Sequence, residues 1–160
     1  MKSKKGLISI IVGIVIMIVG IIVILLATGV IGNKNEKYRV VSVDSYEGDV
    51  SLSRENKDSD LFKGMNLKSG DKISTGGMSN VLLLADSDKS LLAGENTCFT
   101  IEATGNAKKG RIYINLEYGT ALVTIDNKLA EEDSFEIDTP NAALSVRGTI
   151  FEVTYNKETG

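Results

Sequence analysis

The feature that most constrains the fold of this chain is a long uncharged stretch near its N-terminus. Residues 6–32 contain no charged side chain and consist mainly of Ile, Val and Leu. About 20 apolar residues in a helix span a bilayer, so this stretch is long enough to cross with some tilt. Because lipid forces a backbone to hydrogen-bond internally, the many β-branched residues do not argue against a helix. The stretch therefore predicts one transmembrane helix over residues 6–32.

The charges beside this stretch predict its orientation in a membrane. Three lysines precede it and no acidic residue does: Lys2, Lys4 and Lys5. Positive charge on a short N-terminal side places that side in the cytoplasm. We therefore expect a single-pass protein of the cell membrane, with residues 1–5 as a cytoplasmic stub, residues 33–42 as a juxtamembrane linker and residues 43–160 as an extracytoplasmic domain. A cleaved signal peptide is the alternative, although its apolar region would be shorter and would end at an A-x-A site.

Small residues recur along the predicted helix at every seventh position. They are Gly6, Gly13, Gly20 and Ala27. Small residues on one face let two membrane helices approach closely, which predicts a homodimer through the anchor. The alternative is that Gly and Ala are simply common in membrane helices.

The composition of the remaining chain excludes several classes of function. All 21 acidic residues follow the apolar stretch, with 15 of the 18 basic ones, so no basic patch predicts a nucleic-acid partner. The chain has no histidine, which removes the commonest metal ligand and the Ser-His and Cys-His nucleophile pairs. Asp86-Ser87-Asp88 lacks the spacing of an EF-hand loop. We therefore expect neither an enzyme nor a cofactor or metal.

The single cysteine, Cys98, cannot form an intramolecular disulfide or a thiolate zinc site. It lies in a strand-like segment. One interpretation is an intermolecular bridge or a reactive thiol. The other is a small buried hydrophobic residue.

Beyond the linker the chain alternates between short apolar runs and turn residues. The predicted strands cover residues 38–43, 49–53, 71–75, 80–85, 89–93, 97–103, 111–116, 120–125, 134–138, 143–146 and 149–155. Strands at this even spacing, separated by Gly-, Asn- and Asp-rich turns, predict an all-β sandwich or barrel-like domain. The short connection Glu117-Tyr118-Gly119 predicts a hairpin between the runs 111–116 and 120–125.

The last predicted strands form a segment whose inward positions change phase. Leu144 and Val146 are even-numbered, whereas Phe151, Val153 and Tyr155 are odd-numbered. One strand cannot bury both sets on one face unless it slips by one residue, so we expect a β-bulge at Gly148. Arg147 would lie at this bulge, paired with Asp71 or, alternatively, Asp138, because an unpaired buried charge is costly. The other hypothesis is that Arg147 binds an anionic ligand.

Three segments together resemble the FecR domain family, over about residues 43–155. The end motif has Thr139, Pro140, Ala143, Val146, Arg147, Gly148, Thr149, Phe151 and Val153 in place. The G-D-x-I-x-T-G segment has Leu67, Gly70, Asp71, Ile73, Thr75, Gly76 and Ser79 in place. Leu116 and Gly119 match a shorter L-x-x-G element between them. The resemblance implies an all-β, jelly-roll-like β-sandwich.

The resemblance also implies a role at the bacterial envelope. The regulator that gives the family its name has one anchor and relays a signal from an outer-membrane receptor to a cytoplasmic sigma factor. This sequence departs from it, because residues 1–5 are too short to hold a sigma factor and a further outer domain is missing. We therefore expect a binding, scaffolding or sensing module whose partner is an unknown envelope protein or glycan. The alternative is an anti-sigma-type signal transducer that works through a partner protein.

Overall fold

The structure is a computed structural model that describes residues 13–15, 17–21, 39–106, 108–146 and 150–159. The chain divides into two compact units, Met1–Glu36 and Lys37–Gly160. We describe each unit by itself and call the second one the β unit.

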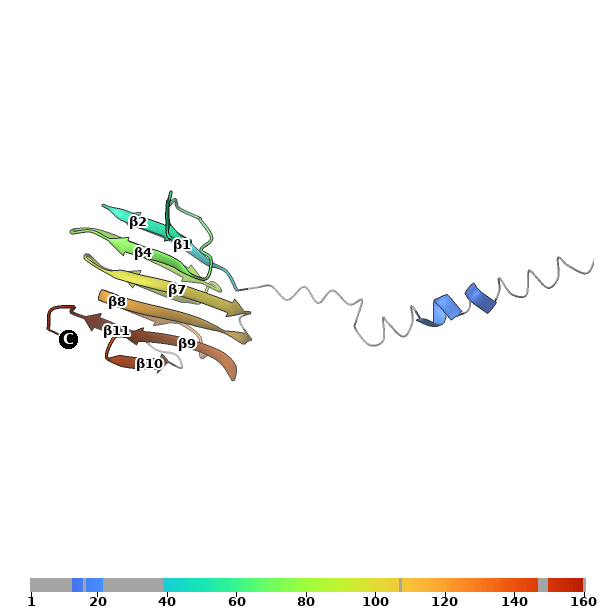
Figure 1. Cartoon of the computed structure of the whole chain (residues 1–160). Coiled ribbons are helices and arrows are strands. Elements are labelled where there is room, and N and C mark those ends of the chain that lie inside the picture. Colours follow the sequence, from blue (N-terminus) through green and yellow to red (C-terminus); the bar gives the residue numbers. More distant parts are fainter. Residues whose placement is uncertain (1–12, 16, 22–38, 107, 147–149, 160) are drawn as a thin grey trace, which may run out of the picture. The chain divides into compact units, whose positions relative to one another are not determined.

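In the first unit, residues 13–15 and 17–21 are helical (Figure 1). Within these described residues, no helix has both the length and the apolar character needed to cross a membrane. Most of the predicted span 6–32, including Gly6 and Ala27, lies outside them. Gly13 and Gly20 lie within the helical residues, and a Cβ at either would have no neighbour within 4 Å.

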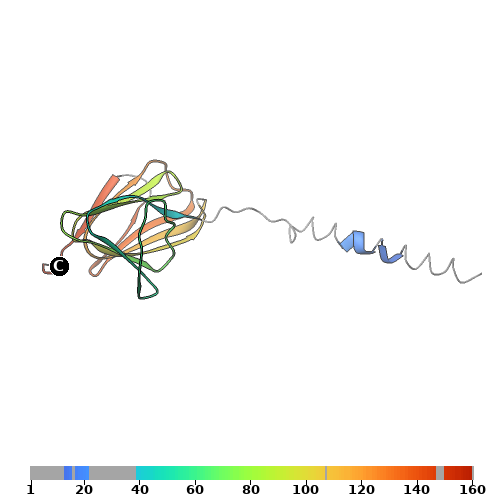
Figure 2. The same cartoon turned by 90° about the horizontal axis from the view of Figure 1, so that it is seen from above.

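The described part of the β unit is built from strands, which confirms the all-β prediction (Figure 1). The strands are β1 (Val41–Glu47), β2 (Val50–Arg54), β3 (Lys57–Ser59), β4 (Asp71–Thr75), β5 (Asn80–Ala85), β6 (Lys89–Ala93), β7 (Cys98–Gly105), β8 (Lys109–Ile125), β9 (Glu132–Thr139), β10 (Ala142–Val146) and β11 (Ile150–Tyr155). They form one sheet in the order β1-β5-β6-β8-β7-β4-β2-β3, with β9, β10 and β11 off this path. The sheet curls on itself around an interior, as Figure 2 shows.

Strand β8 joins the two halves of the curled sheet. Its first half pairs with β7 on one side and with β9, in parallel, on the other. Its second half pairs with β6 and β11. The predicted hairpin at Glu117-Tyr118-Gly119 is therefore wrong, because the chain does not reverse there. Gly119, with φ +100°, lies instead within one 17-residue strand, where the strand changes partners.

The core lies inside the curl and follows the predicted alternation. Ile112, Ile114 and Leu116 from the first half of β8 and Val123 from the second half are at most 1% exposed. The other large side chains that are less than 2% exposed include Leu52, Ile73, Leu83, Phe99 and Ile137. Removing apolar surface from water is the main stabilising contribution to such a fold.

The C-terminal segment differs from its prediction. Strand β10 pairs only with β9 among the described strands, whereas β11 pairs with β8. Val153 is buried and Phe151 and Tyr155 pack against the core, but Leu144 is 36% exposed. The even-numbered and odd-numbered inward positions thus lie on two described strands with different partners. Residues 147–149, and with them the predicted bulge, lie outside the described residues.

The β unit begins earlier than predicted. Arg39 and Val41, which lie in both the predicted linker 33–42 and the predicted strand 38–43, are 7% and 3% exposed. Arg39 Nε donates to Asp86 at 2.8 Å, and Arg39 Nη1 lies 2.7 Å from Asp133 Oδ1. The Lys89 ammonium lies 3.3 Å from Asp86 and 3.8 Å from Asp133. Ion pairs therefore hold Arg39, the first described residue of this unit, inside the fold.

Candidate ligand-binding groove

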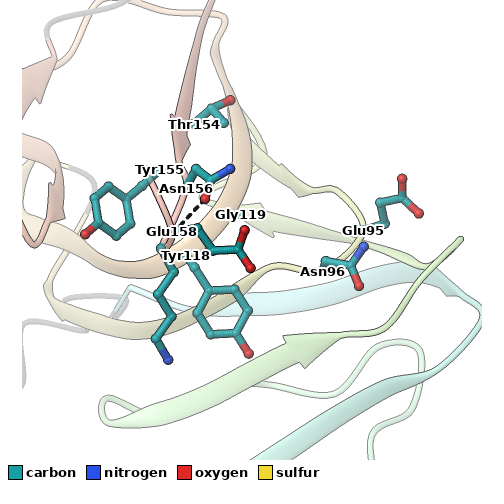
Figure 3. A pocket seen from close by; sticks show the side chains of 9 residues that line it. Glu95, Asn96, Tyr118, Gly119, Thr154, Tyr155, Asn156 and Glu158 are labelled. Atoms are coloured by element: carbon teal, nitrogen blue, oxygen red, sulfur yellow. Dashed lines mark hydrogen bonds between the residues drawn. The ribbon is translucent and has the colours of Figure 1, made fainter. Parts of the chain in front are cut away.

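A groove of about 590 Å³, open to solvent, lies on the β unit where β8 changes partners. Its lining residues are Glu95, Asn96, Tyr118, Gly119, Thr154, Tyr155, Asn156, Lys157 and Glu158 (Figure 3). They come from the turn between β6 and β7, from the middle of β8, and from the end of β11 with the turn that follows it. In the view of Figure 3, Glu95 and Asn96 lie on the opposite side from Tyr155.

The turn that carries Glu95 and Asn96 is held by the end of β4. Thr75 Oγ1 donates to the Gly94 carbonyl at 2.6 Å and accepts from the Thr97 amide at 2.9 Å. The Asn96 amide donates to the Gly76 carbonyl at 3.0 Å. Thr75 and Gly76 belong to the G-D-x-I-x-T-G segment. This segment therefore orients one wall of the groove without lining it.

Gly119 forms the part of the groove that β8 contributes with Tyr118. Its φ of +100° favours glycine, and a Cβ there would overlap the side chain and backbone of Thr97. Thr97 Oγ1 accepts from the Thr120 amide at 3.0 Å, which fastens β8 to the Glu95–Asn96 turn. The glycine of the L-x-x-G element thus permits the close approach of two elements that line the groove.

The third side of the groove is formed by β11 and the turn beyond it. Thr154 Oγ1 lies 3.0 Å from Thr120 Oγ1, within hydrogen-bonding distance. The Glu158 amide donates to Asn156 Oδ1 at 2.8 Å, the contact drawn in Figure 3. The first contact joins β11 to β8, and the second closes the turn that follows β11.

Aromatic and charged groups share the groove. The Lys157 ammonium lies 5.4 Å from the centroid of the Tyr118 ring. Burial, together with the neighbouring Cys98 thiol, raises the pKa of Tyr118. Glu95 and Glu158 against Lys157 give the lining one net negative charge.

Cys98 on β7 pairs with Tyr118 on β8 and is 2% exposed, as expected for a small buried residue. Ser74 Oγ donates to its sulfur at 3.2 Å. Lys72 and Glu117 form an ion pair of 2.7 Å beside it. In the part of the chain that the structure describes, no cluster of three or more acidic or cysteine side chains could hold a metal.

The other residues of the G-D-x-I-x-T-G segment have structural positions. Gly70 has φ +91° in the turn before β4, and Ile73 is fully buried. Asp71, 1% exposed, accepts two bonds from Arg54 at 2.8 and 2.6 Å and one from the Lys68 amide at 2.8 Å. Although burial opposes its charge, these bonds lower the pKa of Asp71. Asp71 thus has Arg54 as its partner, which the sequence did not predict.

The end-motif residues that are described are also structural. Thr139 Oγ1 accepts from the Ala142 amide at 3.1 Å and closes the turn that contains Pro140. Val146, Phe151 and Val153 pack in or against the core. Asp138, the alternative partner proposed for Arg147, accepts a hydrogen bond from the Tyr113 hydroxyl at 3.0 Å. Arg147, Gly148 and Thr149 lie outside the described residues.

Sequence reasoning missed the groove, because its residues are not those that the motifs emphasise. The motifs of the sequence nevertheless contained a signal for the groove. The G-D segment orients the Glu95–Asn96 turn, the L-x-x-G element supplies Gly119, and the end motif leads directly into Thr154 and Tyr155. The three segments of the resemblance therefore meet around one groove.

Comparison with known proteins identifies the family of the chain. The profile of the family described as FecR protein matches residues 71–160, more than half of the chain and all of the groove lining. No curated protein and no solved structure matches the chain. The chain therefore belongs to the FecR family.

Proposed function

We propose that this chain is a membrane-anchored, extracytoplasmic FecR domain that binds, scaffolds or senses a partner at the bacterial envelope. The observation that carries the proposal is the uncharged stretch 6–32, preceded only by basic charge and followed by the β unit. Such a stretch is long enough to hold the chain in a bilayer, and the lysines favour a cytoplasmic N-terminus. Gly6, Gly13, Gly20 and Ala27 would pair two such anchors in a homodimer.

The groove is the surface through which we propose that the domain acts. It combines aromatic, amide and carboxylate groups in a depression, and polar groups of this kind can fix the orientation of a bound ligand. The absence of histidine from the chain supports binding rather than catalysis. The partner would be an envelope protein or a glycan. We further propose that the curled sheet is the jelly-roll-like sandwich of the family.

Membership of the FecR family favours a second candidate, an anti-sigma-type signal transducer. Such a transducer would work through a partner protein that reaches a sigma factor. A crosslinking experiment in native cells separates the two candidates. Recovery of a sigma factor or of its membrane partner would support the transducer.

Topology tests the first proposal. A chain with one epitope tag at each end is expressed in cells whose wall has been removed, and protease is added outside. The C-terminal tag should be lost while the N-terminal tag survives, and the N-terminal tag should resist extraction by alkaline carbonate. Loss of the protein into the carbonate wash, or protection of the C-terminal tag, would rule out the outward anchored arrangement.

A further inference from the structure

We infer that the groove beside Gly119 binds an uncharged pyranose glycan. The inference rests on the proposed function for its setting, since an outward domain would meet envelope polysaccharide. The binding itself depends only on the groove. It can therefore be tested in the purified chain, whatever its topology in the cell.

The size and openness of the groove suit a segment of a polymer. Ligand sites commonly measure about 300–1,000 Å³, and this groove, at about 590 Å³, lies within that range. It opens to solvent rather than enclosing a cavity. A chain of sugars can therefore enter and leave along the surface.

Tyr118 provides an aromatic face that attracts positive partial charge. The face of an aromatic ring is its negative side, and the C–H bonds of a pyranose carry partial positive charge. The Lys157 ammonium lies over this face, 5.4 Å from the ring centroid, so a sugar would take the place of Lys157 there. Lys157 is exposed and can move aside, whereas Tyr118 is half-buried in β8 and stays in place.

Amide and carboxylate groups line the same groove as this ring. A sugar hydroxyl both donates and accepts, so amides and carboxylates together can satisfy it. Among the described residues, neither the side chain of Asn96 nor Asn156 Nδ2 has a hydrogen-bonding partner, and Glu95 uses one oxygen for the Met78 amide at 2.7 Å. These residues line the groove on opposite sides, with Glu95 and Asn96 on one side and Asn156 on the other (Figure 3).

The net negative charge of the lining favours an uncharged glycan over an anionic one. Glu95 and Glu158 outnumber Lys157 in the lining, so an anionic sugar chain would meet net repulsion. An uncharged sugar meets none. The same carboxylates can accept hydrogen bonds from neutral hydroxyls. Hydrogen bonds to an ionised carboxylate are stronger than hydrogen bonds between neutral groups.

The test uses the full-length chain in lipid nanodiscs and calorimetric titration with cellotetraose, maltotetraose and the tetramer of N-acetylglucosamine. We expect at least one to bind with a millimolar or tighter Kd, and tetragalacturonate, an anionic control, to bind at least about tenfold more weakly. Failure of all three neutral tetrasaccharides would overturn the inference. Equal or tighter binding of tetragalacturonate would overturn the preference for an uncharged sugar.

Two variants locate the binding. Asn96 has φ +50°, so Asn96→Gly removes the amide without straining the turn, and Asn56→Gly, at φ +59° in the β2–β3 turn outside the groove, is the matched control. We expect Asn96→Gly to weaken binding about tenfold and Asn56→Gly to leave it unchanged. Tyr118→Phe should bind nearly as well as the natural chain, and Tyr118→Leu about tenfold less well. If Asn96→Gly binds as the natural chain does, the groove is not the site.

Discussion

The ion-pair cluster around Arg39 allows the sharpest prediction about stability. Arg39→Met keeps much of the side-chain volume but removes the guanidinium that contacts Asp86 and Asp133. The side chains of Arg39 and Asp133 are both fully buried. Removing one partner of a buried pair costs about 3–5 kcal/mol, because the other charge is left without compensation.

The geometry places the expected cost at the lower end of that range. The Lys89 ammonium remains 3.3 Å from Asp86 and 3.8 Å from Asp133, so it compensates part of the lost charge. Asp133 has no partner at hydrogen-bonding geometry among the described residues, so its stabilisation comes from nearby charge. Although burial opposes the charge of Arg39, its contacts with Asp133 and Asp86 raise its pKa. We therefore expect Arg39→Met to lower the free energy of unfolding by about 3 kcal/mol.

Urea denaturation of the chain from Lys37 onward measures this loss, because that unit contains the whole core. With a slope of about 1.5 kcal/mol per molar urea, the midpoint should fall by about 2 M. Arg111→Met is the matched control: its pair with Glu136 is exposed and should cost at most about 1 kcal/mol. Adding Asp133→Leu to Arg39→Met should recover at least about 1 kcal/mol. If Arg39→Met costs no more than Arg111→Met, the cluster does not stabilise the fold as argued.

Three further predictions concern other parts of the chain. Because the pKa of Asp71 is lowered in the fold, the ionised carboxylate stabilises the fold fully above its ordinary pKa of 3.8, and this stabilisation is lost as pH falls through the folded pKa. Asp71→Asn has no carboxylate to protonate. In acid denaturation below pH 3.8, Asp71→Asn should therefore lose less stability than the natural chain. Gly119→Ala should lower the free energy of unfolding by at least about 2 kcal/mol, and by more than Gly70→Ala, since both have positive φ but only Gly119 has no space for a Cβ. In a membrane association assay of the isolated anchor, Gly13→Ile with Gly20→Ile should abolish dimerisation; unchanged association would show that these glycines do not form the interface.

Local patterns predicted those parts of the fold in which neighbouring residues decide the outcome. The alternation of Ile112, Ile114 and Leu116 depends only on which side of a strand each residue faces, and all three are buried as expected. The hairpin predicted at Glu117-Tyr118-Gly119 was wrong because strands distant in the sequence, and not neighbouring residues, decided the outcome there. Tyr118-Gly119 has the composition of a turn, but the chain continues because β6 and β11 supply partners for the second half of β8.

Long-range contacts explain what the sequence could not show. Arg39 stands in a polar segment, and its partner Asp86 is 47 residues away. Nothing in the local sequence distinguishes such an arginine from one in a linker. The groove is similar, since Glu95, Tyr118 and Asn156 come together only when the sheet curls. Motifs marked the residues that hold the groove, and the structure was needed to find those that line it.

Outward display of the β unit is the central claim, and thiol labelling tests it most directly. The native Cys98 is buried, so the natural chain provides an unlabelled background in intact cells. Met78 is 92% exposed, so Met78→Cys places one accessible thiol on the β unit, and Ser3→Cys places one on the predicted cytoplasmic stub. With a membrane-impermeant maleimide and wall-stripped cells, the account predicts labelling of Met78→Cys before lysis and of Ser3→Cys only after it. Labelling of Met78→Cys only after lysis would contradict the account.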